Sequence, residues 1–204
     1  MGVPMCGRFT LTLDPGDLRD AFPNIQIPDD LPPRYNIAPT QPIAVITNQS
    51  PNKLDFFTWG LIPSWAKNPE IGNRLINARA ETLAEKPSYR NAFRWRRCLI
   101  LADGFYEWQE IPGTKGKQPI FIYMKDHRPF VFAGLWELWN APDAAQIYSC
   151  TIITTLPNAL MQSIHSRMPV ILPPSAYARW LDTGECLPSD LASLLVSYPA
   201  EDMA

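Results

Sequence analysis

Short stretches of apolar and β-branched residues recur along the chain, each bounded by residues that are typical of turns. Their lengths and their alternation predict strands rather than long helices. Strands are expected over residues 8–13, 43–47, 54–62, 98–102, 119–124, 130–136 and 148–155, with a turn and strand over 165–172. Residues 75–82 are expected to begin as a strand and then turn helical.

Helical periodicity is confined to short segments, at residues 17–21, 158–164, 176–181 and 191–196. We expect Asp17 to cap the first of these helices. The 22 prolines are about twice the usual share, and six of them fall in residues 23–42, which are therefore expected to form a long loop of fixed shape. The pattern predicts the α+β class: one β-rich domain of mostly antiparallel strands, forming a curved sheet or partly open barrel, with short peripheral helices.

The 204 residues are expected to form this single domain, since no linker, repeat or low-complexity tract divides them. Residues 1–5 are expected to be an N-terminal extension that is removed, and residues from about 182 to 204 a tail with a short helix. Because the start lacks the basic and apolar regions of a signal peptide and no apolar run could span a membrane, we expect a cytoplasmic protein. A monomer is expected.

Charge is unevenly distributed, although the net charge is only −2. Residues 74–97 contain two carboxylates, Glu81 and Glu85, and a larger number of basic side chains: Arg74, Arg79, Lys86, Arg90, Arg94, Arg96 and Arg97. An otherwise acidic chain with one Arg-rich segment indicates a local anion-binding face. The alternative is a solvated helix face that carries arginine by chance.

The spacing of the four cysteines and two histidines does not favour a metal site, and no cofactor is expected. The four cysteines form no C-x-x-C pair, and His127 and His165 are far apart. The sequence also contains no phosphate-binding glycine loop, dinucleotide fingerprint or serine nucleophile elbow.

Cys6 is the first candidate for chemistry, because removal of the residues before it would give it a free α-amine beside its thiol. Such a 1,2-aminothiol condenses with an aldehyde to an imine, which the thiol closes into a thiazolidine. An α-amine has a pKa of about 7.7–8.0, so roughly a tenth of it is neutral and nucleophilic at pH 7. The alternative is that Cys6 is a small buried hydrophobic residue.

Two further side chains suit proton transfer. Glu107 lies between Tyr106 and Trp108, where apolar surroundings would raise its pKa, and it follows a strand and a glycine, in a position typical of a functional loop. The alternative is a glutamate on the solvent face of a strand. His165 stands near a proline-shaped turn and has the side chain best matched to neutral pH, although a lone histidine is more often structural.

Taken together, a series of motifs resembles the SOS response-associated peptidase family, the abasic-site processing proteins. The resemblance runs from Cys6 to about Leu181. The motifs follow in order along the chain: Met5-Cys6-Gly7-Arg8, Arg34-Tyr35-Asn36-Ile37-Ala38-Pro39, Trp59-Gly60-Leu61-Ile62-Pro63, Asn77-Ala78-Arg79-Ala80-Glu81, Gly104-Phe105-Tyr106-Glu107-Trp108 and His165-Ser166-Arg167-Met168-Pro169.

The resemblance implies a role for each matching residue. Cys6 would be the nucleophile that captures an abasic-site aldehyde, Asn77 would orient the reactants, Glu107 would act as acid and base, and His165 would assist sugar ring opening and imine chemistry. DNA-binding roles would fall to Arg8, Arg79 and Arg167 at phosphates, Asn36 and Pro39 at the DNA junction, and Trp65 and Trp108 near the bases. This chain departs from the family pattern because four residues precede Met5.

We therefore expect a DNA-damage protein that binds single-stranded DNA, including single-strand/double-strand junctions, and captures abasic sites covalently. It would act as an enzyme that also removes its own leading residues. Two alternatives remain: a cysteine peptidase with Cys6 as an acyl-transfer nucleophile, and a non-covalent single-strand-binding module. The free amine of Cys6 discriminates among them, because only thiazolidine chemistry needs it.

Overall fold

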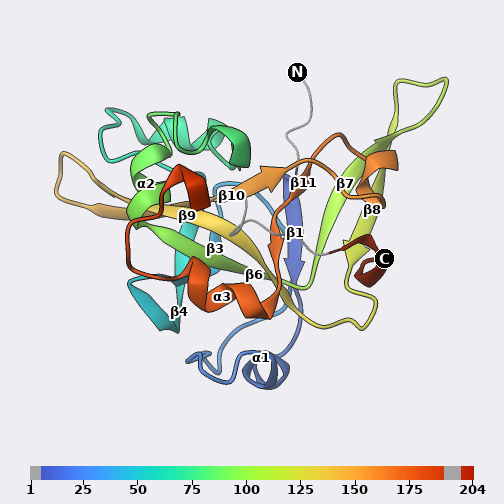
Figure 1. The fold of residues 1–204 in the computed structure, drawn as a ribbon, viewed down its shortest axis with the longest axis horizontal. Helices are drawn as coiled ribbons and strands as arrows, with labels where there is room; N and C mark the ends of the chain where they lie inside the picture. Colours follow the sequence, from blue (N-terminus) through green and yellow to red (C-terminus); the bar gives the residue numbers. More distant parts are fainter. Residues whose placement is uncertain (1–5, 191–198) are drawn as a thin grey trace.

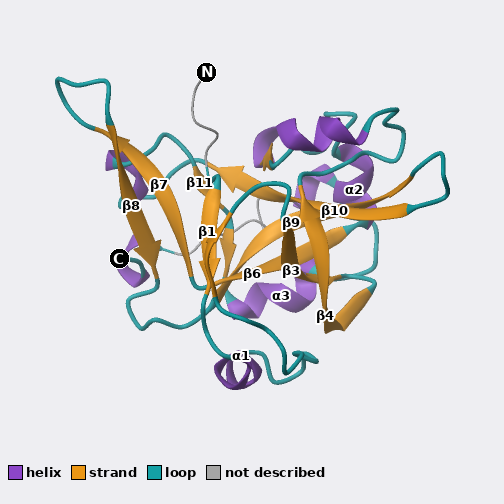
Figure 2. Cartoon of the chain, turned by 180° about the vertical axis from the view of Figure 1, so that it is seen from behind, coloured by secondary structure: helices purple, strands orange, loops and turns teal. Residues whose placement is uncertain are grey.

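The computed structural model describes residues 6–190 and 199–204, and strands are its most abundant regular structure. Figures 1 and 2 show the strands at the centre and the helices at the periphery. The strands are β1 (Arg8–Leu11), β2 (Arg34–Ile37), β3 (Pro42–Thr47), β4 (Ser50–Trp59), β5 (Asn77–Arg79), β6 (Arg97–Ala102), β7 (Gly104–Glu110), β8 (Lys117–Tyr123), β9 (Phe130–Asn140), β10 (Gln146–Thr155), β11 (Met168–Pro169) and β12 (Ile171–Leu172).

Five strands close into a barrel. β4, β3, β6, β9 and β10 pair in that order, each with the next in antiparallel fashion. A parallel pairing of β10 with β4 completes the ring, and β5 adds to β10, also in parallel. The expected α+β architecture with mostly antiparallel strands is confirmed, and the ring of five strands closes rather than remaining partly open.

The other sheet has the order β2-β1-β7-β8 and packs against the barrel. Its inner face carries Phe9 from β1 and Phe105 from β7, both fully buried. The ring of Phe9 lies 5.2 Å from that of Trp59 on β4 and 5.7 Å from that of Phe132 on β9. Edge-to-face packing of these rings therefore joins the two sheets, and it fixes β1 and β7 side by side.

The helices are short, as expected from the many prolines. They are α1 (Pro15–Ala21), α2 (Arg90–Trp95) and α3 (Pro174–Trp180), with 3₁₀ turns η1 (Pro69–Arg74), η2 (Ala80–Thr82), η3 (Met161–Ser163), η4 (Pro188–Asp190) and η5 (Ala200–Asp202). None of the described helices has the length and apolar character needed to cross a bilayer.

Four local predictions differ from the structure or fall outside it. Asp14, not Asp17, caps α1: its carboxylate accepts hydrogen bonds from two backbone N–H groups, because Pro15 already sets the first helical position. The proline-rich stretch 23–42 contains strand β2, whose edge position tolerates nearby prolines. Of the helix expected over 158–164, only η3 forms, and the helix expected over 191–196 lies outside the described residues.

Candidate functional site

Cys6 lies immediately before β1, and its side chain is fully buried. Its φ is 43°, in the left-handed region that residues other than glycine adopt only rarely. Burial, and then the nearby carboxyl of Glu107, raises the pKa of the Cys6 thiol well above its ordinary value of 9.0. The thiol therefore remains protonated. Cys98 and Cys150 are equally buried, so burial alone does not single out Cys6.

Glu107 is what distinguishes Cys6 from the other cysteines. The backbone N–H of Cys6 donates a hydrogen bond to Oε1 of Glu107 at 2.5 Å. Glu107 is only 1% exposed, and desolvation raises the pKa of its carboxyl from 4.5 to about 7, although hydrogen bonds from the backbone of Cys6 and Trp108 oppose that rise. A group that titrates near pH 7 thus contacts the nitrogen that would become the α-amine.

The structure corrects the expected loop position of Glu107 and excludes the alternative of a solvent-facing side chain. It stands in the middle of β7 rather than in a loop, and it points inward rather than toward solvent. Residues alternate between the two faces of a strand, so Tyr106 and Trp108 lie on the face opposite to Glu107. Glu107 is held by a regular strand, and its position next to Cys6 follows from the pairing of β7 with β1.

His165 and Trp108 line a common cleft of about 740 Å³. Nδ1 of the half-buried His165 accepts a hydrogen bond from the backbone N–H of Arg167 at 3.2 Å. In the neutral ring the proton is then on Nε2, which makes that nitrogen the donor. The amide of Gln109 donates to the backbone oxygen of Ser163 at 2.7 Å and ties the two walls of the cleft together.

Arg8 and Asn36 are brought together on neighbouring strands β1 and β2. A guanidinium nitrogen of Arg8 donates to the side-chain oxygen of Asn36 at 2.7 Å, and this contact is exposed. Arg8 also lies opposite Tyr106 in the pairing of β1 with β7. Pro39 is half-buried just beyond β2. The cation of Arg8 is thus exposed and held in place by a neutral partner.

Arg79 and Arg167 converge on β10. Arg79 lies opposite Thr154 in the pairing of β5 with β10, and Arg167 donates to the backbone oxygen of Thr154 at 2.7 Å. Arg167 also forms a two-pronged ion pair with Glu81, at 2.7 and 2.8 Å. Hydrogen bonding to Arg167 lowers the pKa of Glu81. Glu81, which the sequence did not single out, thus holds Arg167 beside Arg79.

Asn77 begins the same short strand β5 and pairs with Ile152 of β10. Its backbone oxygen accepts a hydrogen bond from the hydroxyl of Tyr89 at 3.1 Å. Asn77 and Arg79 are both on extended backbone two residues apart, so their side chains share one face of the strand.

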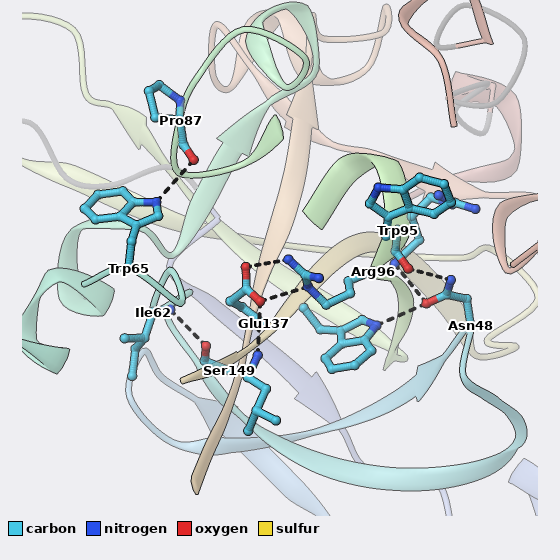
Figure 3. Close-up of polar contacts among 11 residues, drawn as sticks. Asn48, Ile62, Trp65, Pro87, Trp95, Arg96, Glu137 and Ser149 are labelled. Atoms are coloured by element: carbon cyan, nitrogen blue, oxygen red, sulfur yellow. Dashed lines mark hydrogen bonds and ion pairs between the residues drawn. The ribbon is translucent and has the colours of Figure 1, made fainter. Parts of the chain in front are cut away.

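Trp65 is exposed on a well-anchored loop. Its side chain is 56% exposed, and its indole N–H donates to the backbone oxygen of Pro87 at 3.5 Å (Figure 3). The backbone N–H of Ile62 donates to the hydroxyl of Ser149 at 2.8 Å, and the indole N–H of Trp139 donates to the backbone oxygen of Ala66 at 2.7 Å. Contacts on both sides of Trp65 therefore fix the loop on the barrel.

Glu137 is a second buried carboxylate that the sequence did not single out. It lies between Trp136 and Leu138, in the same kind of apolar setting as Glu107, and is 5% exposed. Its carboxylate pairs with the guanidinium of Arg96 at 2.8 and 2.9 Å, as Figure 3 shows. Desolvation raises the pKa of Glu137, and Arg96 opposes that rise. Its charge is thus neutralised, whereas that of Glu107 is not.

We expect Glu137→Ala to destabilise the fold by about 2–3 kcal/mol, because it leaves the partly buried Arg96 without its counter-ion. Urea unfolding with an unchanged m-value measures the loss. Glu185→Ala is the matched control, since its pair with Arg94 is 3.7 Å long and about half exposed, and its removal should cost less than about 1 kcal/mol. Equal losses in the two variants would contradict a structural role for the Arg96–Glu137 pair.

The seven basic residues of segment 74–97 divide into two groups in the structure. Arg74, Arg79, Lys86, Arg90 and Arg94 are exposed. Arg97, in contrast, is 2% exposed, and its guanidinium donates to backbone oxygens that include those of Phe93 and Trp180. The anion-binding face that the sequence predicts can therefore use the exposed group, while Arg96 and Arg97 hold the core together. Across residues 6–190 and 199–204, no three metal-binding side chains gather at one place.

Comparison with known proteins identifies the family. The sequence model of the family described as SOS response associated peptidase (SRAP) matches residues 5–204. The chain belongs to the SRAP family. This match confirms the resemblance that the motifs predicted, and it covers Cys6, Glu107 and His165 together with both sheets of the fold.

Relatives of this SRAP chain include the abasic site processing protein YoqW of Bacillus subtilis (strain 168), 49% identical over 98% of this chain and 90% of its own length. The abasic site processing protein HMCES of Xenopus tropicalis is 33% identical over 98% of this chain and 72% of its own length. A crystal structure of a protein from Bacteroides thetaiotaomicron superposes with a TM-score of 0.87, at 28% identity, over 98% of this chain and 90% of that one.

Proposed function

We propose that this protein processes abasic sites in DNA by capturing the sugar aldehyde in a thiazolidine with Cys6. The observation that carries the proposal is the 2.5 Å contact between the Cys6 nitrogen and the buried carboxyl of Glu107. Both relatives described above are named for abasic site processing, which supports the substrate.

The reaction follows from these groups in a sequence of balanced steps. The neutral α-amine of Cys6 attacks the aldehyde carbon of the ring-opened deoxyribose and gives a carbinolamine. Glu107, whose pKa is about 7, donates a proton to the departing hydroxyl, and water leaves as the imine forms. The protonated thiol then adds to the imine carbon and transfers its proton to nitrogen. One molecule of water is released in all. His165 would assist opening of the sugar ring from the adjoining cleft.

The same geometry supports release of residues 1–5. While they are attached, the Cys6 nitrogen is an amide, and no imine can form. Attack of the Cys6 thiol on the carbonyl of Met5 would give a thioester, with the thiol proton passing through Glu107 to the departing nitrogen. Hydrolysis of that thioester would release residues 1–5 and leave the α-amine free. A carboxyl 2.5 Å from the leaving nitrogen is well placed for this transfer.

A peptidase that acts on other proteins is less well supported. Cys6 is fully buried, and cleavage of another protein would need room at its thiol for an incoming peptide, whereas attack on the carbonyl of the preceding residue needs none. Binding of single-stranded DNA is part of our proposal, with phosphates held by Arg8, Arg79 and Arg167 and bases near Trp65 and Trp108. Asn36 and Pro39 would lie at the DNA junction.

The deciding experiment is a denaturing gel of the mature protein mixed with a single-stranded oligonucleotide that carries one abasic site. We expect an adduct that survives heat and detergent, and no adduct with the undamaged oligonucleotide. A mass equal to protein plus DNA minus one water would show condensation with the aldehyde, and stability of the adduct without a reductant would distinguish the thiazolidine from the imine of equal mass. If no stable adduct forms although the protein begins at Cys6, the proposal fails.

We expect Glu107→Gln to slow adduct formation by about 10²–10⁴-fold, the usual contribution of a positioned acid–base group. The wild-type rate should pass through a maximum between about pH 7 and pH 8, because the amine must be neutral while the carboxyl of Glu107 must be protonated, and the fall on the alkaline side should vanish in the variant. Single-turnover rates over a pH series measure both effects. Glu110→Gln, an exposed carboxyl on the same strand, is the control. An unchanged pH profile in Glu107→Gln would contradict the assigned role.

A further inference from the structure

We infer that the DNA-binding surface extends beyond the candidate site, along the exposed face of α2 as far as Trp95. Here the term α2 surface means Trp65, Lys86, Arg90, Arg94 and Trp95. The inference rests on the proposed DNA function and names a second contact for the strand that flanks the lesion. Its occupant is single-stranded DNA, whose bases would stack on the indoles while its phosphates contact the cations.

Hydrogen bonds connect Trp65 to the segment that leads into α2. The indole N–H of Trp65 donates to the backbone oxygen of Pro87, the neighbour of Lys86. The backbone N–H of Arg90 donates to the oxygen of Lys86 at 2.9 Å, which begins the first turn of α2. The surface is thus continuous with Trp65, a residue already assigned to DNA.

The two faces of α2 differ sharply. Ala92 and Phe93 are buried against the barrel, whereas Arg90, Arg94 and Trp95 are exposed. Trp95 keeps 46% of its side chain in solvent, although an indole is among the most costly side chains to leave there. An exposed indole beside two arginines is the combination that binds single strands, because every base offers a flat face for stacking.

A buried polar network fixes Trp95 in place, as Figure 3 shows. The side-chain amide of Asn48 donates to the backbone oxygen of Trp95 at 3.0 Å. The side-chain oxygen of Asn48 accepts hydrogen bonds from the indole of Trp136 and from the backbone N–H of Arg97, both at 3.1 Å. Arg96, between the two, is held by Glu137. The network fixes the backbone of Trp95, so only the side chain has to be ordered when a base stacks on the indole.

Charge favours a nucleic acid over other partners. Lys86, Arg90 and Arg94 face solvent, and the carboxylates near them are Glu85 next to Lys86 and Glu185, which lies 3.7 Å from Arg94. The pair with Glu185 is exposed and therefore weak enough for a phosphate to replace it. The surface remains positive in a chain whose net charge is −2, which gives it the electrostatic character of a DNA contact.

The test measures the affinity of the mature protein for undamaged single-stranded oligonucleotides, one short and others lengthened at the 5′ or the 3′ end. We expect lengthening at one end to tighten binding, and Trp95→Ala to weaken binding of that longer oligonucleotide about 5- to 140-fold, the range measured for loss of one stacked base. Trp95→Phe should restore most of the affinity. Arg90→Ala and Arg94→Ala should each reduce the log–log salt slope by about 0.7.

Phe56→Ala is the matched control, since Phe56 is also 46% exposed but lies on β4. Its affinity for every oligonucleotide should equal that of the wild type. The inference is overturned if Trp95→Ala still binds the longer oligonucleotide more tightly than the short one, or if Phe56→Ala loses as much affinity as Trp95→Ala. It is also overturned if a double-stranded extension tightens binding equally in the wild type and in Trp95→Ala. Adduct formation by the wild type on a short abasic oligonucleotide is measured in parallel, and its absence would count against the proposed function alone.

Discussion

Replacing Cys6 by alanine is expected to abolish the heat-stable adduct with abasic DNA. The variant is prepared so that its chain begins at position 6, because without the thiol it could not release residues 1–5 itself. The α-amine is then present, and the imine can still form beside Glu107. Without the thiol, however, no ring closes over the imine, and water hydrolyses it. The expected loss is therefore complete on a denaturing gel, whatever the reaction time.

Borohydride distinguishes formation of the imine from closure of the thiazolidine ring. When it is added during the reaction, borohydride reduces an imine to a stable amine. Cys6→Ala should then give an adduct band on the gel, whereas the wild type should give its band with or without borohydride. Cys98→Ala, another fully buried cysteine, is the control and should form adduct as the wild type does. An untrapped, heat-stable band with Cys6→Ala would rule out the thiazolidine and point to another nucleophile.

Retention of residues 1–5 is expected to have an equally large effect, because an amide nitrogen cannot form an imine. The yield of adduct should track the fraction of chains that intact mass shows to begin at Cys6. A leader-bearing preparation should gain activity only as that fraction grows, and Glu107→Gln should delay the growth. If chains that still carry Met1 form stable adducts at the rate of mature chains, the aminothiol mechanism is wrong for this protein.

Strand positions were predictable because apolar alternation along this chain is clear. The stretches around Ile43, Ile100 and Ile152 all proved to be barrel strands. The closure of the ring was beyond sequence reasoning, because it depends on a parallel pairing of β10 with β4 between segments far apart in the chain. Such long-range pairing leaves no local pattern in either strand.

In the candidate site, too, local features were predictable from the sequence and long-range contacts were not. Cys6 and Glu107 were each found from local chemistry, but only the pairing of β1 with β7 shows that they touch. The sequence signal of a carboxyl among aromatic residues also occurs at Glu137. At Glu137 the guanidinium of Arg96, 2.8 Å away, neutralises the charge. Arg96 precedes Glu137 by about forty residues, so no local pattern reveals the pair. The sequence also did not show which arginines of segment 74–97 are exposed to solvent.

The positive φ of Cys6 gives the leading peptide a defined energetic role. A left-handed conformation costs a residue with a side chain about 1–2 kcal/mol, because the side chain crowds the neighbouring peptide groups. The angle φ is defined only while a carbonyl precedes the nitrogen. When residues 1–5 depart, the torsion ceases to exist, and the strain ends without any movement of Cys6 or of β1. In the proposed maturation, relief of strain at the bond that breaks would therefore favour the cut form of the folded chain over the uncut one.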